Sequence, residues 1–260
     1  MPASRPSPTK CRRRRLPVAL VAAVFPGLAF GTDGAANPYG LAALWAGSDI
    51  VARAVLVVML LMSIASWYVI ITRAFDQARM LRQARTAREA FAQGGDDAAL
   101  LGALVPGSPF RHVAESGLDA LRRHTPVAAR ISLDDWLSLG LRRAGDRVQS
   151  RAQEGLALLA TVGSTSPFIG LFGTVWGIYH ALTAIGVAGQ ASIDKVAGPV
   201  GEALIMTAIG LAVAVPAVLG YNWLVRRNRA VMEAVRGFAA DMHERLLASD
   251  SAPESARPAH

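Results

Sequence analysis

The sequence predicts an all-α integral membrane protein with three transmembrane helices, which are extended by long cytoplasmic helices. Three observations support this fold class. Three apolar runs are each long enough to cross a bilayer, which takes about 20 residues of helix. Hydrophobic residues make up 52% of the 260 positions and charged residues only 18%, which is more apolar than a usual soluble domain. Finally, arginines cluster at particular ends of the runs, so the net charge of +8 indicates membrane topology rather than nucleic-acid binding.

The arginine clusters predict the orientation of the spans. Basic residues are retained on the cytoplasmic side of a membrane. The first run is followed by Arg73, Arg79, Arg82, Arg85 and Arg88. The second run is preceded by Arg142, Arg143, Arg147 and Arg151, and the third is followed by Arg226, Arg227 and Arg229. The N-terminus is therefore expected outside the cytoplasm.

The N-terminal residues are typical of a secretory signal peptide. The basic stretch "KCRRRR" precedes the apolar stretch "LPVALVAAVFPGLAF", which is short for a membrane span, and Ala29 and Gly31 supply the small residues of a cleavage site. An uncleaved anchoring segment is the alternative. The single cysteine, Cys11, excludes an intrachain disulfide and a cysteine-rich metal site, and no cofactor is expected.

These signals divide the chain into eight segments. They are a signal peptide (1–31), a periplasmic segment (32–49), a first transmembrane helix (50–72), a cytoplasmic helical domain (73–154), a second transmembrane helix (155–187), a periplasmic loop (188–195), a third transmembrane helix (196–225), and a cytoplasmic C-terminal helix with a disordered tail (226–260). Within the cytoplasmic domain, Ser132 resembles an N-cap, and the helix it starts could run unbroken into the second span.

Small residues recur every three or four positions in the second span. The stripe contains Gly163, Ser166, Gly170, Gly173, Thr174 and Gly177. In lipid such stripes let helix backbones approach closely, and Gly173 with Gly177 forms a GxxxG pair. The spacing matches no phosphate-binding loop. Pro167 and Pro216 are expected to kink the second and third spans.

Glu202 is the carboxylic acid of the third span. A charge at the bilayer centre costs about 2.5–3.5 kcal/mol on an insertion scale, and Arg53 is the only Lys, Arg or Asp within the three spans. Glu202 is therefore expected to face a pore and to exchange protons. A neutral structural glutamic acid in a helix interface is the alternative.

Three further polar side chains are candidates for the same pathway. Thr174 and Thr207 either bond back to their own helix carbonyls or serve the pore, and His180 either titrates or is a hydrogen-bonded structural residue. One acid makes an incomplete proton path. The remaining groups are expected from copies of this chain or from another subunit, and the small helix faces suggest a ring of identical subunits around a pore.

Two long motifs carry a family resemblance. "GSTSPFIGLFGTVWGIYHALTAIG" and "GPVGEALIMTAIGLAVAVPAVLGYN" closely resemble the ExbB/TolQ/MotA proton-channel family, and its ExbB branch most of all. The resemblance covers about residues 41–242. It implies a homopentamer in the bacterial inner membrane around transmembrane helices of ExbD. It also implies that the complex uses the proton-motive force to drive TonB, which energises outer-membrane uptake of siderophore-bound iron and vitamin B12.

The resemblance also assigns roles to residues. The pore acid of the family matches Glu202, and its two pore threonines match Thr174 and Thr207. An aspartate of ExbD would supply the second acid. The resemblance implies no enzymatic activity.

Two other functions remain as alternatives. A TolQ-like subunit of the Tol-Pal envelope system is the nearest, whereas MotA fits less well. A non-conducting membrane scaffold with an inert Glu202 is the second. A secondary transporter would need more spans and inverted repeats, which the sequence does not show.

Overall fold

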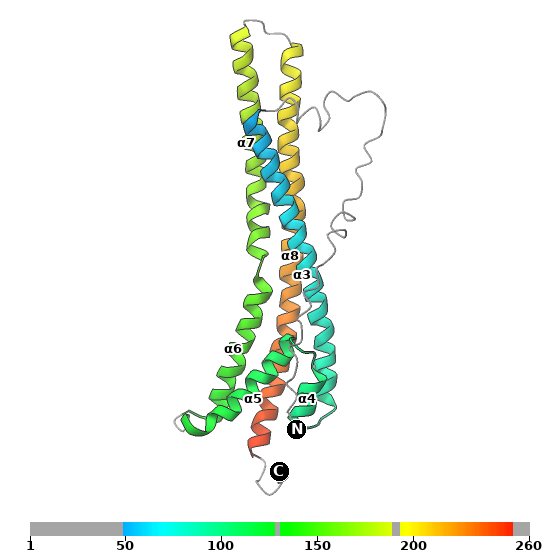
Figure 1. Cartoon of the computed structure of the whole chain (residues 1–260), viewed down its shortest axis with the longest axis vertical. Coiled ribbons are helices and arrows are strands. Elements are labelled where there is room, and N and C mark those ends of the chain that lie inside the picture. Colours follow the sequence, from blue (N-terminus) through cyan, green and yellow to red (C-terminus); the bar gives the residue numbers. More distant parts are fainter. Residues whose placement is uncertain (1–48, 128–130, 189–192, 252–260) are drawn as a thin grey trace, which may run out of the picture. The chain divides into compact units, whose positions relative to one another are not determined.

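The computed structural model describes residues 49–127, 131–188 and 193–251, and their regular structure is helical. The helices are α3 (Ile50–Ala92), α4 (Asp97–Ala103), α5 (Pro109–Val127), α6 (Leu133–Gln153), α7 (Leu156–Ala188) and α8 (Ile193–Ser251) (Figure 1). The predicted signal peptide, almost all of the predicted periplasmic segment, and the end of the predicted tail lie outside the described residues.

Three helical stretches of the described chain are long and apolar enough to cross a membrane. They are Ile50–Ala92, Leu133–Val187 and Gly198–Ser249, so the expected set of three candidate spans is confirmed. Each stretch is longer than a bilayer requires because the helices continue into segments rich in arginine. Large apolar side chains such as Phe168, Leu182 and Leu219 are more than half exposed, as expected for surfaces that face lipid or another subunit.

Helices α7 and α8 lie side by side and pack through small residues (Figure 1). A Cβ atom added at Gly170 would lie 2.8 Å from the carbonyl oxygen of Met206 and 3.1 Å from the Cα of Gly210. A Cβ atom added at Gly210 would lie 2.8 Å from the carbonyl oxygen of Ser166. The two backbones therefore touch at this level, which only glycine permits. Helix α3 packs against both helices, with Val55 and Met59 buried beside Met206.

The arginine-rich halves of the long helices form a second, larger core with α4, α5 and α6. Val231, Val235, Phe238 and Met242 of α8 are all buried in it. They meet a face of α5 that includes Phe110, Val113 and Leu118, and the Phe110 and Phe238 rings pack edge to face with centroids 5.5 Å apart. The apolar residues of each helix recur at intervals of three to five positions, which places them on one face. The predicted N-cap is confirmed as well, since the Ser132 hydroxyl accepts a hydrogen bond from the Asp135 N–H at 3.2 Å.

The expectation of an unbroken helix from Ser132 into the second span is wrong. Helix α6 ends at Gln153 and α7 begins at Leu156, and Gly155 between them has a φ of 82°. This left-handed conformation ends a helix, and glycine adopts it without strain. Side chains of other helices donate to carbonyl groups at the end of α6. The Arg73 guanidinium donates to the Arg151 carbonyl at 3.3 Å, and the Asn228 amide donates to the Ala152 carbonyl at 2.7 Å.

His112 lies in α5 and is half-buried rather than fully at the surface. Burial lowers the pKa of its imidazole below the ordinary value, and the positive charges of Arg147 and Arg151 lower the pKa further, against a raising effect of Glu115. A neutral imidazole is therefore favoured in the folded bundle.

Candidate functional site in the membrane-spanning helices

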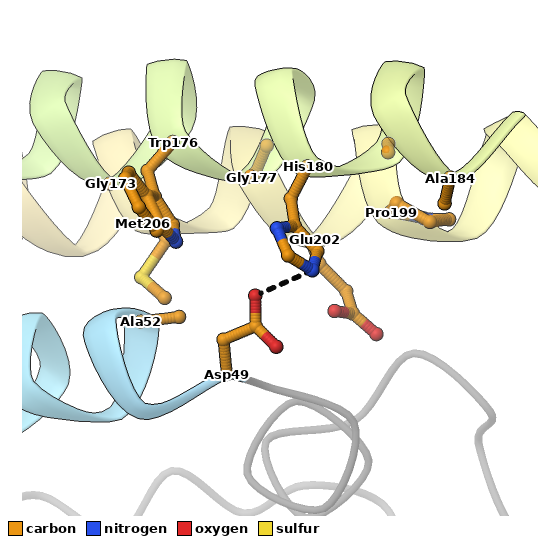
Figure 2. Close-up of a pocket in the computed structure, with 12 residues that line it drawn as sticks. Asp49, Ala52, Gly173, Trp176, Gly177, His180, Ala184, Pro199, Glu202 and Met206 are labelled. Atoms are coloured by element: carbon orange, nitrogen blue, oxygen red, sulfur yellow. Dashed lines mark ion pairs between the residues drawn. The ribbon is translucent and has the colours of Figure 1, made fainter. Parts of the chain in front are cut away.

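Glu202 lines a cavity between α3, α7 and α8 (Figure 2). The cavity has a volume of about 180 Å³. Its polar lining comes from Asp49 at the start of α3, from Trp176 and His180 on α7, and from Glu202 on α8, while Ala52 and Met206 belong to its apolar lining. The site therefore combines two carboxylates and an imidazole in otherwise apolar surroundings.

Helical spacing explains why these side chains converge. On α8, Pro199, Glu202, Ala203 and Met206 follow one another at intervals that place them on one face of a helix. On α7 the corresponding face carries Gly173, Gly177, His180 and Ala184. The two glycines leave the space that the larger side chains of α8 and α3 occupy. A Cβ at Gly177 would lie 3.3 Å from the Ala203 Cβ, and one at Gly173 would lie 3.2 Å from the Met206 Cβ.

Asp49 and His180 are in direct contact at one end of the cavity. The His180 Nε2 atom lies 3.1 Å from the Asp49 Oδ2 atom, as the dashed line in Figure 2 marks. Asp49 is the N-cap residue of α3, yet its carboxylate makes no capping hydrogen bond to that helix. Sequence analysis missed Asp49 because it precedes the apolar run, where an aspartate is usually a solvated cap.

Aromatic rings pack along α7 beside His180. The Trp176 and His180 rings stack with centroids 6.5 Å apart and planes 20° from parallel, and the Phe172 and Trp176 rings stack at 6.4 Å. The Trp176 indole N–H is buried and has no hydrogen-bond partner among the residues that the structure describes. The described residues therefore leave this donor of a cavity-lining residue unpaired.

Thr174 and Thr207 lie at the contact between α7 and α8 and are not part of the cavity lining. The Thr174 hydroxyl donates to the Leu171 carbonyl of its own helix at 2.6 Å, and the Thr207 hydroxyl lies 3.5 Å from the Thr174 hydroxyl. Both interpretations of these threonines from the sequence therefore remain open. Two turns along α7, Ser166 is fully buried and its hydroxyl has no partner within the described part of the chain. Three hydroxyl groups therefore follow one another along this interface.

Gly163, Pro167 and Pro216, which the sequence also singled out, lie outside the cavity lining. Gly163 faces Val218 of α8, and a Cβ atom added at Gly163 would lie 2.5 Å from the Val218 Cγ2 atom. Helices α7 and α8 continue through Pro167 and Pro216. In the described ranges, no group of three or more His, Cys, Asp or Glu side chains is placed to hold a metal ion.

Comparison with known proteins places this arrangement in a family. The profile of the MotA/TolQ/ExbB proton channel family matches residues 108–236, which include Thr174, His180, Glu202 and Thr207. The chain is 42% identical over 208 residues to a biopolymer transport protein ExbB of Xanthomonas campestris, an alignment that covers 76% of this chain and 82% of the relative. The chain belongs to the MotA/TolQ/ExbB proton channel family.

Other members of the family are similar over the same region. A biopolymer transport protein ExbB of Neisseria meningitidis is 40% identical, with 76% of this chain and 93% of the relative covered. A Tol-Pal system protein TolQ of Haemophilus influenzae is 37% identical, with 75% of this chain and 88% of the relative covered. The family and the three candidate spans identify a membrane protein of a proton-channel family, and both ExbB and TolQ branches are represented among its relatives.

Proposed function

We propose that this chain is the proton-channel subunit of a TonB–ExbB–ExbD complex in the bacterial inner membrane. In this complex it converts the proton-motive force into work for TonB-dependent uptake across the outer membrane. The observation that carries the proposal is the position of Glu202, a carboxylic acid on an apolar helix that lines a polar cavity. The similarity to relatives named ExbB supports the choice of complex.

The cost of Glu202 argues for a role in proton transfer. An ionisable group inside the membrane is expensive and usually faces a cavity or a partner. Glu202 is half-buried, and its neighbours on the same helix face are Pro199, Ala203 and Met206. A purely structural position in this face would be filled by an apolar residue at lower cost. A carboxyl group that takes up and releases protons explains why an acid stands here.

The proton path needs groups from outside this chain. Beyond the cavity, the polar side chains at the contact between α7 and α8 include the hydroxyls of Thr174, Thr207 and Ser166. A hydroxyl group does not gain or lose a proton near neutral pH, so these residues cannot store one. A second acid from ExbD, in a pore surrounded by five copies of this chain, would complete the path. The exposed apolar residues of α7 and α8, among them Phe168, Leu171, Leu204 and Leu211, provide surfaces for these neighbours and for lipid.

Substitution of Glu202 tests the proposal. Glu202→Gln keeps the size and hydrogen-bonding capacity of the side chain but carries no exchangeable carboxyl proton, so energised uptake should be abolished while the complex still assembles. Glu202→Ala should have the same effect, and Glu202→Asp should keep partial activity because the acid remains. Each proton that crosses supplies about 2.3 kcal/mol per 100 mV of membrane potential, and this work is lost when the site cannot reload.

The measurement is TonB-dependent substrate uptake, normalised to the amount of assembled complex. Thr174→Ala and Thr207→Ala should impair uptake without abolishing it, because their hydroxyls position water or the acid. Uptake at the wild-type level in Glu202→Gln would leave the scaffold as the better description.

A TolQ-like role is the second candidate, since a TolQ relative is 37% identical. Complementation separates the two. The chain should restore uptake in cells that lack ExbB, given its own ExbD, and should not restore envelope integrity in cells that lack TolQ.

A further inference from the structure

Asp49 is the N-cap residue of α3, but its side chain does not cap that helix. Aspartate is among the best N-cap residues because its carboxylate satisfies free N–H groups of the first turn. Here the carboxylate makes no such bond and lies 3.1 Å from the His180 Nε2 atom instead. The helix thus lacks its usual side-chain cap, and the carboxylate is directed to an imidazole that lines the same cavity as Glu202.

We propose that Asp49 and His180 form a proton-loading pair for Glu202, in which His180 relays the proton and Asp49 is its positioning residue. The inference rests on the proposed function of Glu202 and adds the step that supplies it. Figure 2 shows the three side chains directed into one cavity from α3, α7 and α8.

The exposure of the pair suits contact with the aqueous phase. The His180 side chain is 58% exposed and the Asp49 side chain 43%, whereas Glu202 is half-buried beside Pro199 and Ala203. Histidine side chains gain and lose protons near neutral pH, which makes them suited to relays. Protons from the adjoining solution therefore reach the imidazole before they reach the acid.

The proton transfer from His180 to Glu202 needs no reactant other than water. The His180 Nε2–H group donates to the Asp49 carboxylate, which leaves Nδ1 to accept a proton and form the imidazolium. The imidazolium then releases a proton through water to the Glu202 carboxylate. The ring returns to its neutral form and Glu202 becomes a neutral carboxylic acid, ready to pass the proton on.

The cavity can hold the water that the transfer needs. Its volume of about 180 Å³ exceeds the roughly 30 Å³ that one water molecule occupies in the liquid. Buried water also needs two to four polar partners. The His180 ring and the carboxylates of Glu202 and Asp49, which all line the cavity, supply these partners.

The charged groups near His180 come from the two helices that pack against α7. Asp49 contributes a negative charge from the start of α3 and Glu202 another from α8. Arg53 lies one turn further along α3, and its backbone N–H donates to the Asp49 carbonyl at 2.9 Å. The Asp49 carboxylate, 3.1 Å from the His180 Nε2 atom, fixes the orientation and tautomer of the ring, so its loss should disturb the relay.

The test measures proton flux as a function of pH. The complex is purified with co-expressed ExbD and TonB and reconstituted into vesicles of phosphatidylethanolamine and phosphatidylglycerol that contain a pH-sensitive dye. Flux is recorded at a series of external pH values for wild type, His180→Asn, His180→Gln, Asp49→Asn and the double variant Asp49→Asn/His180→Asn. Tyr179→Phe is the matched control, because Tyr179 is an exposed neighbour of His180 outside the cavity lining.

His180→Asn should lower flux by about tenfold, because a positioned proton-transfer group contributes about 10²- to 10⁴-fold and water bypasses part of the relay. It should also flatten the pH profile near neutrality. Asp49→Asn should lower flux and change its pH profile, since the carboxylate that holds the ring is then replaced by a neutral amide. The double variant should be no worse than His180→Asn, as expected for residues that act as a unit, and Tyr179→Phe should match wild type.

Other outcomes overturn the pair. A wild-type pH profile in both His180 variants would show that His180 is structural, even if flux falls, and an unshifted profile in Asp49→Asn would remove the positioning role. Glu202→Gln distinguishes this failure from failure of the proposed function. Flux that disappears in Glu202→Gln but keeps its wild-type level and pH profile in His180→Asn rejects the pair alone, whereas wild-type flux in Glu202→Gln rejects both.

Discussion

Asn228 is a buried amide that joins three helices where the apolar and arginine-rich parts of the chain meet. Its Nδ2 donates to the Ala152 carbonyl of α6 at 2.7 Å, and its Oδ1 accepts a hydrogen bond from the Gln77 Nε2 of α3 at 2.6 Å. The same Gln77 nitrogen donates to the Leu224 carbonyl at 3.1 Å. This network holds the end of α6 beside the break at Gly155.

Asn228→Leu should destabilise the protein because it leaves the Ala152 carbonyl buried without its donor. The loss of a buried partner costs about 1–3 kcal/mol, so the thermal midpoint of the detergent-solubilised protein should fall. The matched control is Asn222→Leu, an exposed asparagine on the same helix, which should change the midpoint little. Equal changes in the two variants would show that the Asn228 network does not contribute to stability.

Single residues were predictable from the sequence only where their type conflicts with their surroundings. Glu202 stands out because an acid in an apolar run needs an explanation. No such conflict marks Asp49, Gln77 or Asn228, because an aspartate before a helix and an amide in a charged helix are ordinary surface residues. The Asn228 partners Ala152 and Gln77 are 76 and 151 positions away along the chain, and only the folded chain reveals them.

At the scale of helices, the contact between α7 and α8 is set by the glycine pair Gly170 and Gly210. Each lacks the Cβ atom that would collide with a backbone carbonyl of the other helix at 2.8 Å. Backbone atoms cannot yield as a flexible side chain can. The spacing of these helices, and hence the cavity one or two turns away at Gly173 and Gly177, depends on this pair.

Gly170→Ala should therefore push α7 and α8 apart and reduce both stability and uptake. Overpacking of this kind costs about 1–3 kcal/mol, which a lower thermal midpoint of the solubilised protein would register. Gly186→Ala is the control on the same helix, because a Cβ atom added there would meet nothing within 4 Å. It should be neutral or slightly stabilising, by up to about 1 kcal/mol from helix propensity. A Gly170→Ala protein as stable and active as Gly186→Ala would contradict the close contact.

The helix faces were predictable because burial follows helical period, as Val231, Val235 and Phe238 show. The position at which α7 and α8 approach most closely was not predictable from the sequence. The sequence drew attention to the Gly173–Gly177 pair, whereas the backbones approach most closely at Gly170, since that depends on which residue of α8 stands opposite. The break at Gly155 was missed for a similar reason. A glycine between two helix-forming runs is compatible with a continuous helix, and contacts from Arg73 and Asn228 decide against it.

At the scale of the whole molecule, apolar side chains have two different environments. Along α7 and the first half of α8, residues such as Phe168, Leu182, Leu204 and Leu219 are exposed. Along the second half of α8, the apolar residues are enclosed by α3, α4, α5 and α6 in one core. A soluble protein would bury the first set, so its exposure fits a bilayer and neighbouring subunits. The second set forms the core of a helical bundle.

This division, together with the arginine clusters, leads to a prediction of orientation. The bundle should lie in the cytoplasm, and the end of the helices that carries Asp49 and His180 should face the periplasm. Single cysteines are introduced in a Cys11→Ser background at Val187, which is 91% exposed, and at Ala98, which is exposed in α4. In whole cells, a membrane-impermeant maleimide that has passed the outer membrane should label Val187→Cys and leave Ala98→Cys unlabelled. After lysis both should react, which controls for accessibility. Labelling of Ala98→Cys in intact cells would show the opposite orientation. The proton-loading pair would then face the cytoplasm, whereas the proton-motive force drives protons inward from the periplasm.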